Sequence, residues 1–157
     1  LSGLCIESAH FGFRSGDLYE INQYSMIQQD RLKHLKQRSL KDFISVWYQQ
    51  SLFKQSHLLL SVDQLLEKNR LPKDYLISLF DDLSVDKQVC FLDYVEKLPF
   101  NMCYISGSED EKYANLSLKL ASYNHINSHI ISGADHNVHL SQFEQFKQVL
   151  MEYLSFC

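Results

Sequence analysis

The sequence is poor in glycine and proline and has no closely spaced cysteines. Of its 157 residues, five are Gly, two are Pro and four are Cys. So few chain-breaking residues predict that most of the chain is helix or strand, without a low-complexity linker. Cys5, Cys90, Cys103 and Cys157 include no C-x-x-C pair, which argues against a zinc or redox motif. We therefore expect reduced thiols and a cytoplasmic location.

Three further features are missing. There is no block of basic residues, and the net charge of −4 comes from interspersed acids and bases, so we expect no nucleic-acid partner. No apolar run approaches the roughly 18 residues of a membrane-spanning helix, so we expect no membrane partner. There is also no signal peptide. The 13% aromatic content is enough to build a core or an apolar pocket.

The pattern of apolar residues predicts a mixed α/β chain. Residues 1–13 form a core strand, Leu4–Glu7, with its loop, and residues 14–98 form a helical region. Residues 99–157 alternate between strands, around 102–105 and 129–131, and helices, which predicts parallel strand pairing.

Individual helices are signalled by capping residues and by helical spacing. Apolar residues at Leu40, Phe43, Ile44 and Trp47 share one helical face after Ser39. A second apolar stripe follows Pro72, and a further helix is predicted from Asp86 to Lys97, ended by Pro99. Ser108-x-x-Glu111 is a capping box at the start of another helix, and an apolar stripe from 140 to 153 marks the last one.

Titratable residues follow the two C-terminal strands, where open α/β sheets carry their functional groups. The first loop holds Glu109 and Asp110, and the second holds Asp135, His136 and His139. An acid followed by a histidine matches the later part of an α/β-hydrolase triad, in which the acid orients the imidazole that takes a proton from the nucleophile.

Purely structural roles for Asp110 and His136 are also compatible with this spacing. By spacing alone, these structural roles are favoured over a catalytic triad. Asp110 could simply cap a helix, stabilising it by ~0.5 kcal/mol. His136 could be an ordinary loop histidine. His136 and His139 lack the third ligand that a metal site needs.

Four segments resemble a known enzyme family. They are Glu7–Phe13, Trp47–Phe53, Ser106–Tyr113 and Gly133–His139. They are similar, in the same order, to segments of the 2-succinyl-6-hydroxy-2,4-cyclohexadiene-1-carboxylate synthase family, which has the α/β-hydrolase fold. W-Y-Q-Q-x-x-F is the most specific of the four.

The resemblance implies the C-terminal part of that fold: a helical cap and the last parallel strands of the sheet. It makes Asp110 the triad acid, with Glu109 as the neighbouring alternative, and His136 the triad base. For the substrate it implies Arg31, Trp47 and Arg70, with Lys68 as a rival to Arg70. Trp47 could equally be a core aromatic, and Arg31 could equally be a solvated surface charge. For Arg70 the surface charge is the favoured interpretation.

The implied reaction is a lyase step of menaquinone (vitamin K2) biosynthesis. Pyruvate would be eliminated from 2-succinyl-5-enolpyruvyl-6-hydroxy-3-cyclohexene-1-carboxylate, a small anionic cyclohexene carboxylate whose carboxylates suit arginine. The family uses no cofactor and no metal.

The sequence departs from the family in one large respect. It contains no G-x-S-x-G nucleophile elbow and no H-G oxyanion loop, so we expect the N-terminal strands that carry them to be absent. We expect the 157-residue polypeptide alone to have no synthase activity, being either part of a longer product or the truncated, non-catalytic remnant of a gene. An ester or thioester hydrolase of the same fold is the other alternative.

Overall fold

The computed structural model describes residues 3–61, 64, 67, 70–95 and 97–156. The chain divides into two compact units. Unit 1 comprises Leu1–His10, Gln49–Leu59 and Asp93–Cys157, and unit 2 comprises Phe11–Tyr48 and Leu60–Leu92. Each unit has its own packing and is described separately.

Unit 1 is built on a parallel sheet of three strands. Its strands are β1 (Leu4–Glu7), β2 (Met102–Gly107) and β3 (Ile126–Ile131). They pair in the order β1-β2-β3, with Cys5 opposite Cys103 and Ile105 opposite His129. The sequence prediction of parallel strands is confirmed.

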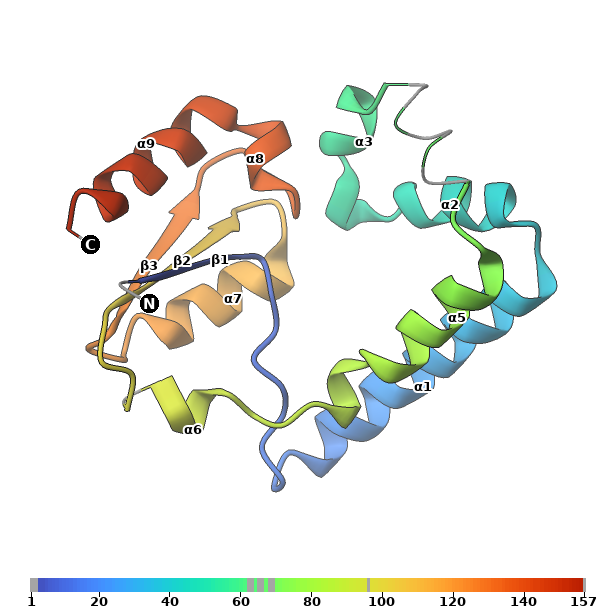
Figure 1. Cartoon of the computed structure of the whole chain (residues 1–157), viewed down its shortest axis with the longest axis horizontal. Coiled ribbons are helices and arrows are strands. Elements are labelled where there is room, and N and C mark those ends of the chain that lie inside the picture. The colour runs from blue at the N-terminus through green and yellow to red at the C-terminus, as the bar shows by residue number, and fades with distance from the viewer. Residues whose placement is uncertain (1–2, 62–63, 65–66, 68–69, 96, 157) are drawn as a thin grey trace. The chain divides into compact units, whose positions relative to one another are not determined.

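Helices cover both faces of this sheet. The helical segments of unit 1 include a 3-10 turn (Ser51–Phe53), α3 (Ser56–Leu59), α7 (Glu111–Leu120), α8 (Val138–Ser141) and α9 (Phe143–Leu154). The short α6 (Leu92–Val95) begins at the last residue of unit 2 in the sequence and continues into unit 1. α7 lies on one face, and α8 and α9 lie on the other (Figure 1). All six residues of β2 are buried, as expected for a central strand with helices on both sides.

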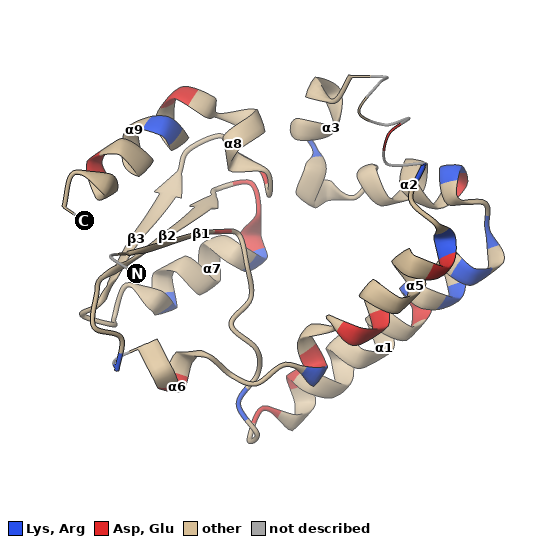
Figure 2. Cartoon of the chain, viewed as in Figure 1, with Lys and Arg blue, Asp and Glu red and all other residues tan. Residues whose placement is uncertain are grey.

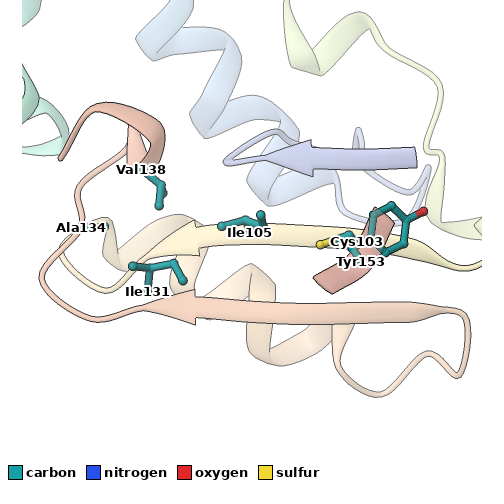
Figure 3. Packing of buried hydrophobic residues seen from close by; sticks show 6 residues of the cluster. All are labelled: Cys103, Ile105, Ile131, Ala134, Val138 and Tyr153. Carbon is teal, nitrogen blue, oxygen red and sulfur yellow. The ribbon is translucent and has the colours of Figure 1, made fainter. Parts of the chain in front are cut away.

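The two faces of β2 receive alternate side chains. Cys103 and Ile105 join Ile131, Ala134, Val138 and Tyr153 in the core beneath α8 and α9 (Figure 3). On the α7 face, the Ser117 and Ser128 hydroxyls hydrogen-bond each other at 2.6 Å. This alternation follows from the two-residue period of a strand, and it fixes which loop residues emerge at the carboxyl ends of β2 and β3.

Unit 2 is helical. Its elements among the described residues include α1 (Leu18–Gln37), α2 (Leu40–Tyr48), α5 (Lys73–Asp82) and a 3-10 turn (Val85–Lys87). Leu35, Phe43 and Ile44 form its core, with Trp47 and Phe80 packed against them. Basic residues gather at the carboxyl end of α1 (Figure 2), where the Lys73 ammonium donates to the Lys36 and Arg38 carbonyls at 2.8 Å each. A cation there complements the helix dipole.

The predicted helix from Asp86 to Lys97 is wrong. The structure has the 3-10 turn Val85–Lys87 and then the short α6, separated by non-helical chain. The Phe91 N–H donates to the Phe11 carbonyl at 2.7 Å, so a tertiary hydrogen bond replaces a helical one. Gly12 permits this approach, since a Cβ there would lie 2.6 Å from the Val89 carbonyl oxygen.

The segment Gln49–Leu59 belongs to the sheet unit, although the sequence places it within the helical region 14–98. Backbone N–H groups of Gln55 and Ser56 donate to the Asp135 carboxylate, and the Leu52 carbonyl accepts from the His136 N–H. These bonds tie the segment to the loop after β3. Within the described ranges, no helix combines the length and the apolar character needed to cross a membrane.

Candidate active site

Two loops meet at the carboxyl ends of β2 and β3. The Ser108 N–H donates to the Ile131 carbonyl at 2.9 Å, and the Glu109 N–H donates to the Ala134 carbonyl at 2.9 Å. The Gly133 N–H donates to the Ser108 hydroxyl at 2.9 Å. Ser108 therefore connects the two loops, while the side-chain cap of α7 is Asp110, not the Ser108 predicted by the capping box.

Glycine at position 107 makes this meeting possible. A Cβ there would lie 2.3 Å from the carbonyl oxygens of Ala134 and Asp135, closer than any side chain tolerates. Only a residue without a Cβ lets the two backbones approach so closely.

Asp110 and His136 form a short hydrogen bond across the two loops. His136 Nδ1 lies 2.6 Å from Asp110 Oδ2, and the exposed fractions of the two side chains are 25% and 5%. Glu109, the alternative acid, instead lies 4.0 Å from the Lys54 ammonium in an exposed ion pair. Of the two acids, the geometry therefore joins Asp110 to the histidine.

The arrangement of the Asp110 carboxylate and the His136 imidazole is that of a general base. Asp110 stands at the amino end of α7, and its carboxylate also accepts a long hydrogen bond, 3.4 Å, from the Tyr113 N–H. That position favours a negative charge. A neutral imidazole that donates from Nδ1 to Asp110 leaves Nε2 as an acceptor, ready to take a proton.

Two aromatic rings hold the His136 imidazole. The Phe53 ring meets it edge-on, with ring centroids 5.6 Å apart, and the Tyr113 ring lies at 5.0 Å. The His136 backbone N–H donates to the Leu52 carbonyl at 3.0 Å. These contacts restrict the ring to few orientations and shield its hydrogen bond from water.

His139 belongs to a separate pair. Its Nδ1 lies 2.8 and 2.9 Å from the two carboxylate oxygens of Glu7, and its backbone N–H donates to the same carboxylate at 2.9 Å. The pair fastens α8 to the end of β1. Across the described residues, no three His, Cys, Asp or Glu side chains gather as a metal site would require.

Further titratable groups surround the loop after β1. Burial lowers the pKa of His10 to about 4, with a smaller contribution from the Lys112 ammonium. Burial raises the pKa of Tyr104, whose hydroxyl donates to the Ala9 carbonyl at 2.9 Å. Tyr113 and the Asp110 carboxylate also raise the pKa of Tyr104, to a smaller extent.

The serines at strand ends do not complete a triad in the described structure. Ser8, directly after β1, has a left-handed φ of 41° and is buried. The Ser8 and Ser106 hydroxyls have no hydrogen-bond partner among the described residues. No hydrogen bond between a serine hydroxyl and His136 is found there either, so the structure assigns no nucleophile.

The candidate substrate residues Arg31, Trp47 and Arg70 all lie in unit 2. The Arg31 guanidinium sits 5.2 Å from the centre of the Trp47 ring. Burial raises the pKa of Tyr24, whose side chain also hydrogen-bonds Arg31. Arg70 is exposed in the turn before α5 and forms an ion pair with Glu67 at 3.6 Å. Lys68, the rival of Arg70, lies outside the described residues.

Trp47 borders an apolar pocket of about 170 Å³ within unit 2. Its ring stacks on Phe43, with centroids 5.8 Å apart, and meets Phe80 edge-on at 5.2 Å. The pocket is lined by Phe43, Ile44, Trp47, Tyr48, Leu71, Leu76 and Phe80. The Arg31 guanidinium therefore lies beside one aromatic residue of the pocket wall, Trp47.

Among solved structures, the chain is similar to MenH from S. aureus. The TM-score is 0.85 at 19% sequence identity, over 99% of this chain. The chain spans 59% of the length of that MenH chain. No family model matches the sequence, and no curated protein matches it. The likeness shows the fold alone: the mixed α/β architecture is that of part of the MenH chain.

The sequence drew attention to Asp135 only as one of several loop acids. Its side chain is fully buried, and its partners Gln55 and Ser56 lie about 80 positions earlier. No local pattern reports such a contact. Phe53, whose ring contacts the His136 imidazole, is the last residue of Trp47–Phe53, one of the four segments that resemble the synthase family.

Proposed function

We propose that Asp110 and His136 are the acid and base of a synthase of menaquinone biosynthesis. The observation that carries the proposal is the 2.6 Å hydrogen bond between His136 Nδ1 and Asp110 at the carboxyl ends of adjacent parallel strands. It occurs in a chain with the fold of part of MenH from S. aureus. The four segments resembling the synthase family support the same reaction.

The proposed reaction eliminates pyruvate from 2-succinyl-5-enolpyruvyl-6-hydroxy-3-cyclohexene-1-carboxylate. His136 Nε2 takes the proton of a serine hydroxyl while Asp110 stabilises the imidazolium that forms. The serine oxygen removes the ring proton next to the succinyl carbonyl, the electron pair shifts through the ring, and the C–O bond to the enolpyruvyl group breaks. The departing enolpyruvate takes a proton from the His136 imidazolium and becomes pyruvate. Backbone N–H groups stabilise the enolate oxygen.

The proposal assigns the serine to no residue of this sequence. Two groups of unit 2 are proposed for the substrate. Arg31 binds a substrate carboxylate, and Trp47 offers an apolar wall to the ring. Trp47 lines the pocket described above, and the Arg31 guanidinium lies 5.2 Å from the centre of its ring. Arg70 is the weaker candidate because it is exposed and paired with Glu67.

A hydrolase of esters or thioesters is the second candidate, because the Asp110–His136 pair would serve that reaction equally well. Arg31 discriminates between the two. An esterase needs no arginine directed at a substrate carboxylate, so Arg31→Ala would leave its KM unchanged. For the synthase we expect Arg31→Ala to raise KM by roughly tenfold or more, the effect of one charge-assisted hydrogen bond.

Pyruvate release tests the proposal directly. The protein to assay is the product of the longest reading frame that contains these 157 residues, with wild type compared with His136→Ala. We expect release to fall by about 10²–10⁴-fold, the usual contribution of a general base. His34→Ala, an exposed histidine of α1 paired with Asp30 at 3.5 Å, is the matched control and should be fully active. Wild-type protein that hydrolyses esters but releases no pyruvate would favour the hydrolase, and absence of both activities would favour a non-catalytic remnant.

A further inference from the structure

Asp135 is the most deeply buried charged side chain of the candidate site. Its exposed fraction is 0%, and its carboxylate accepts three backbone N–H groups. Oδ2 accepts from Gln55 at 2.8 Å and from Ser56 at 2.6 Å, and Oδ1 accepts from Asn137 at 3.1 Å. No ion pair to Asp135 is present in the part of the chain that the structure describes. A buried carboxylate is tolerated when backbone donors satisfy it, as they do here.

The three consecutive residues Asp135, His136 and Asn137 are all bound to the segment 52–56. The His136 N–H donates to the Leu52 carbonyl at 3.0 Å, and the Asn137 side-chain amide donates to the Ser56 hydroxyl at 3.0 Å. The Phe53 ring lies against the imidazole between these anchors. The backbone of His136 is therefore fixed on both sides by one short segment of the chain.

We propose that Asp135 is a positioning residue that holds the His136 imidazole toward Asp110. With the backbone of residue 136 held, only the two side-chain torsions of the histidine are free, and Phe53 and Tyr113 limit those. Loss of the Asp135 anchors would let the loop 134–137 shift away from the segment 52–56. The 2.6 Å contact with Asp110 would then lengthen, because it joins two separate loops. The inference rests on the proposed function only for its catalytic consequence.

Asp135→Asn is the sharpest perturbation. The amide has one oxygen where the carboxylate has two, so it cannot accept all three N–H groups with the same geometry. If the amide oxygen keeps Gln55 and Ser56, its NH₂ group faces the Asn137 N–H, a donor against a donor. The disturbance then falls on the residue next to His136.

The readout is the His136 Nδ1 proton in the purified 157-residue chain with ¹⁵N-labelled histidine. A proton shared with Asp110 gives a low-field resonance that exchanges slowly with water. We expect Asp135→Asn to speed this exchange by roughly tenfold to a hundredfold, as for the loss of a hydrogen bond to a charged group. The dispersed amide spectrum should be retained. Glu7→Gln is the matched control, because it changes another carboxylate that accepts a backbone N–H, that of His139.

The exchange measurement separates the positioning role of Asp135 from the Asp110–His136 pair itself. An unchanged exchange rate in folded Asp135→Asn protein would overturn the positioning role. If that variant does not fold, Asp135→Ser replaces it, since the shorter side chain offers a single oxygen and places no NH₂ group against the Asn137 N–H. Faster exchange in Asp135→Ser supports the proposal, and wild-type exchange contradicts it. Absence of the slowly exchanging proton in the wild type would instead refute the Asp110–His136 pair, and with it the proposed function.

Discussion

Gly107→Ala should strongly destabilise the protein. The added Cβ would lie 2.3 Å from two carbonyl oxygens, whereas carbon–oxygen contacts are normally about 3.3 Å or longer. The backbone at Ala134 and Asp135 would therefore have to move by about 1 Å. Overpacking of this kind costs about 1–3 kcal/mol, and more when backbone must move.

The sign of the effect is diagnostic. In a strand without such a contact, alanine would stabilise by ~0.5–1 kcal/mol relative to glycine. With the contact, we expect a net loss of about 3 kcal/mol, which lowers the melting temperature by roughly 6–12 °C in a chain of this size. Thermal unfolding followed by circular dichroism measures it.

Gly16→Ala is the matched control for this prediction. A Cβ at Gly16 meets nothing within 4 Å, so its melting temperature should stay within a few degrees of wild type. The low-field His136 proton should survive in Gly16→Ala and be lost or broadened in Gly107→Ala. A Gly107→Ala protein as stable as the wild type would refute the close approach of the two loops.

Three further predictions concern other parts of the chain. His10 has a pKa of about 4 in the folded protein against an ordinary value of 6.5, so the unfolded chain binds more protons between these values. The free energy of unfolding should therefore fall as the pH drops from 6.5 toward 4, and urea titrations should show a shallower fall in His10→Gln. Trp47→Ala removes two aromatic contacts from unit 2 and should lower the free energy of unfolding by about 2–3 kcal/mol in the same titrations. Arg31→Ala should lower it by under ~1 kcal/mol. Equal losses of stability in the two variants would contradict the packing described. The 157-residue polypeptide alone should release no pyruvate, and a measurable rate in a coupled lactate dehydrogenase assay would show that it holds its own nucleophile.

The sequence predicted the sheet well because its signals there are local. The first strand was predicted at Leu4–Glu7, and the structure has the same bounds. Met102–Ile105 reads as a buried apolar run in the sequence and lies in the central strand, which extends two residues further, to Gly107. The predicted helix from Asp86 failed because a hydrogen bond between Phe91 and Phe11, 80 positions apart, took the place of a local one.

The candidate site was predictable in part. Loops at the carboxyl ends of strands pointed to Asp110 and His136, but spacing alone could not separate a triad from a helix cap beside a loop histidine. In the structure Asp110 caps α7 and also accepts a hydrogen bond from His136. The role proposed for Asp135 could not be predicted, because its partners at 55 and 56 come from a distant segment.

A double-mutant cycle on pyruvate release tests the central claim most directly. It compares Asp110→Asn, His136→Ala and the double variant in the product of the longest reading frame that contains these residues. If the two side chains act as one acid–base unit, Asp110→Asn lowers kcat/KM strongly in the wild type and by nothing further in the His136→Ala background. Losses that multiply in the double variant would show that Asp110 and His136 act independently, and would contradict the account.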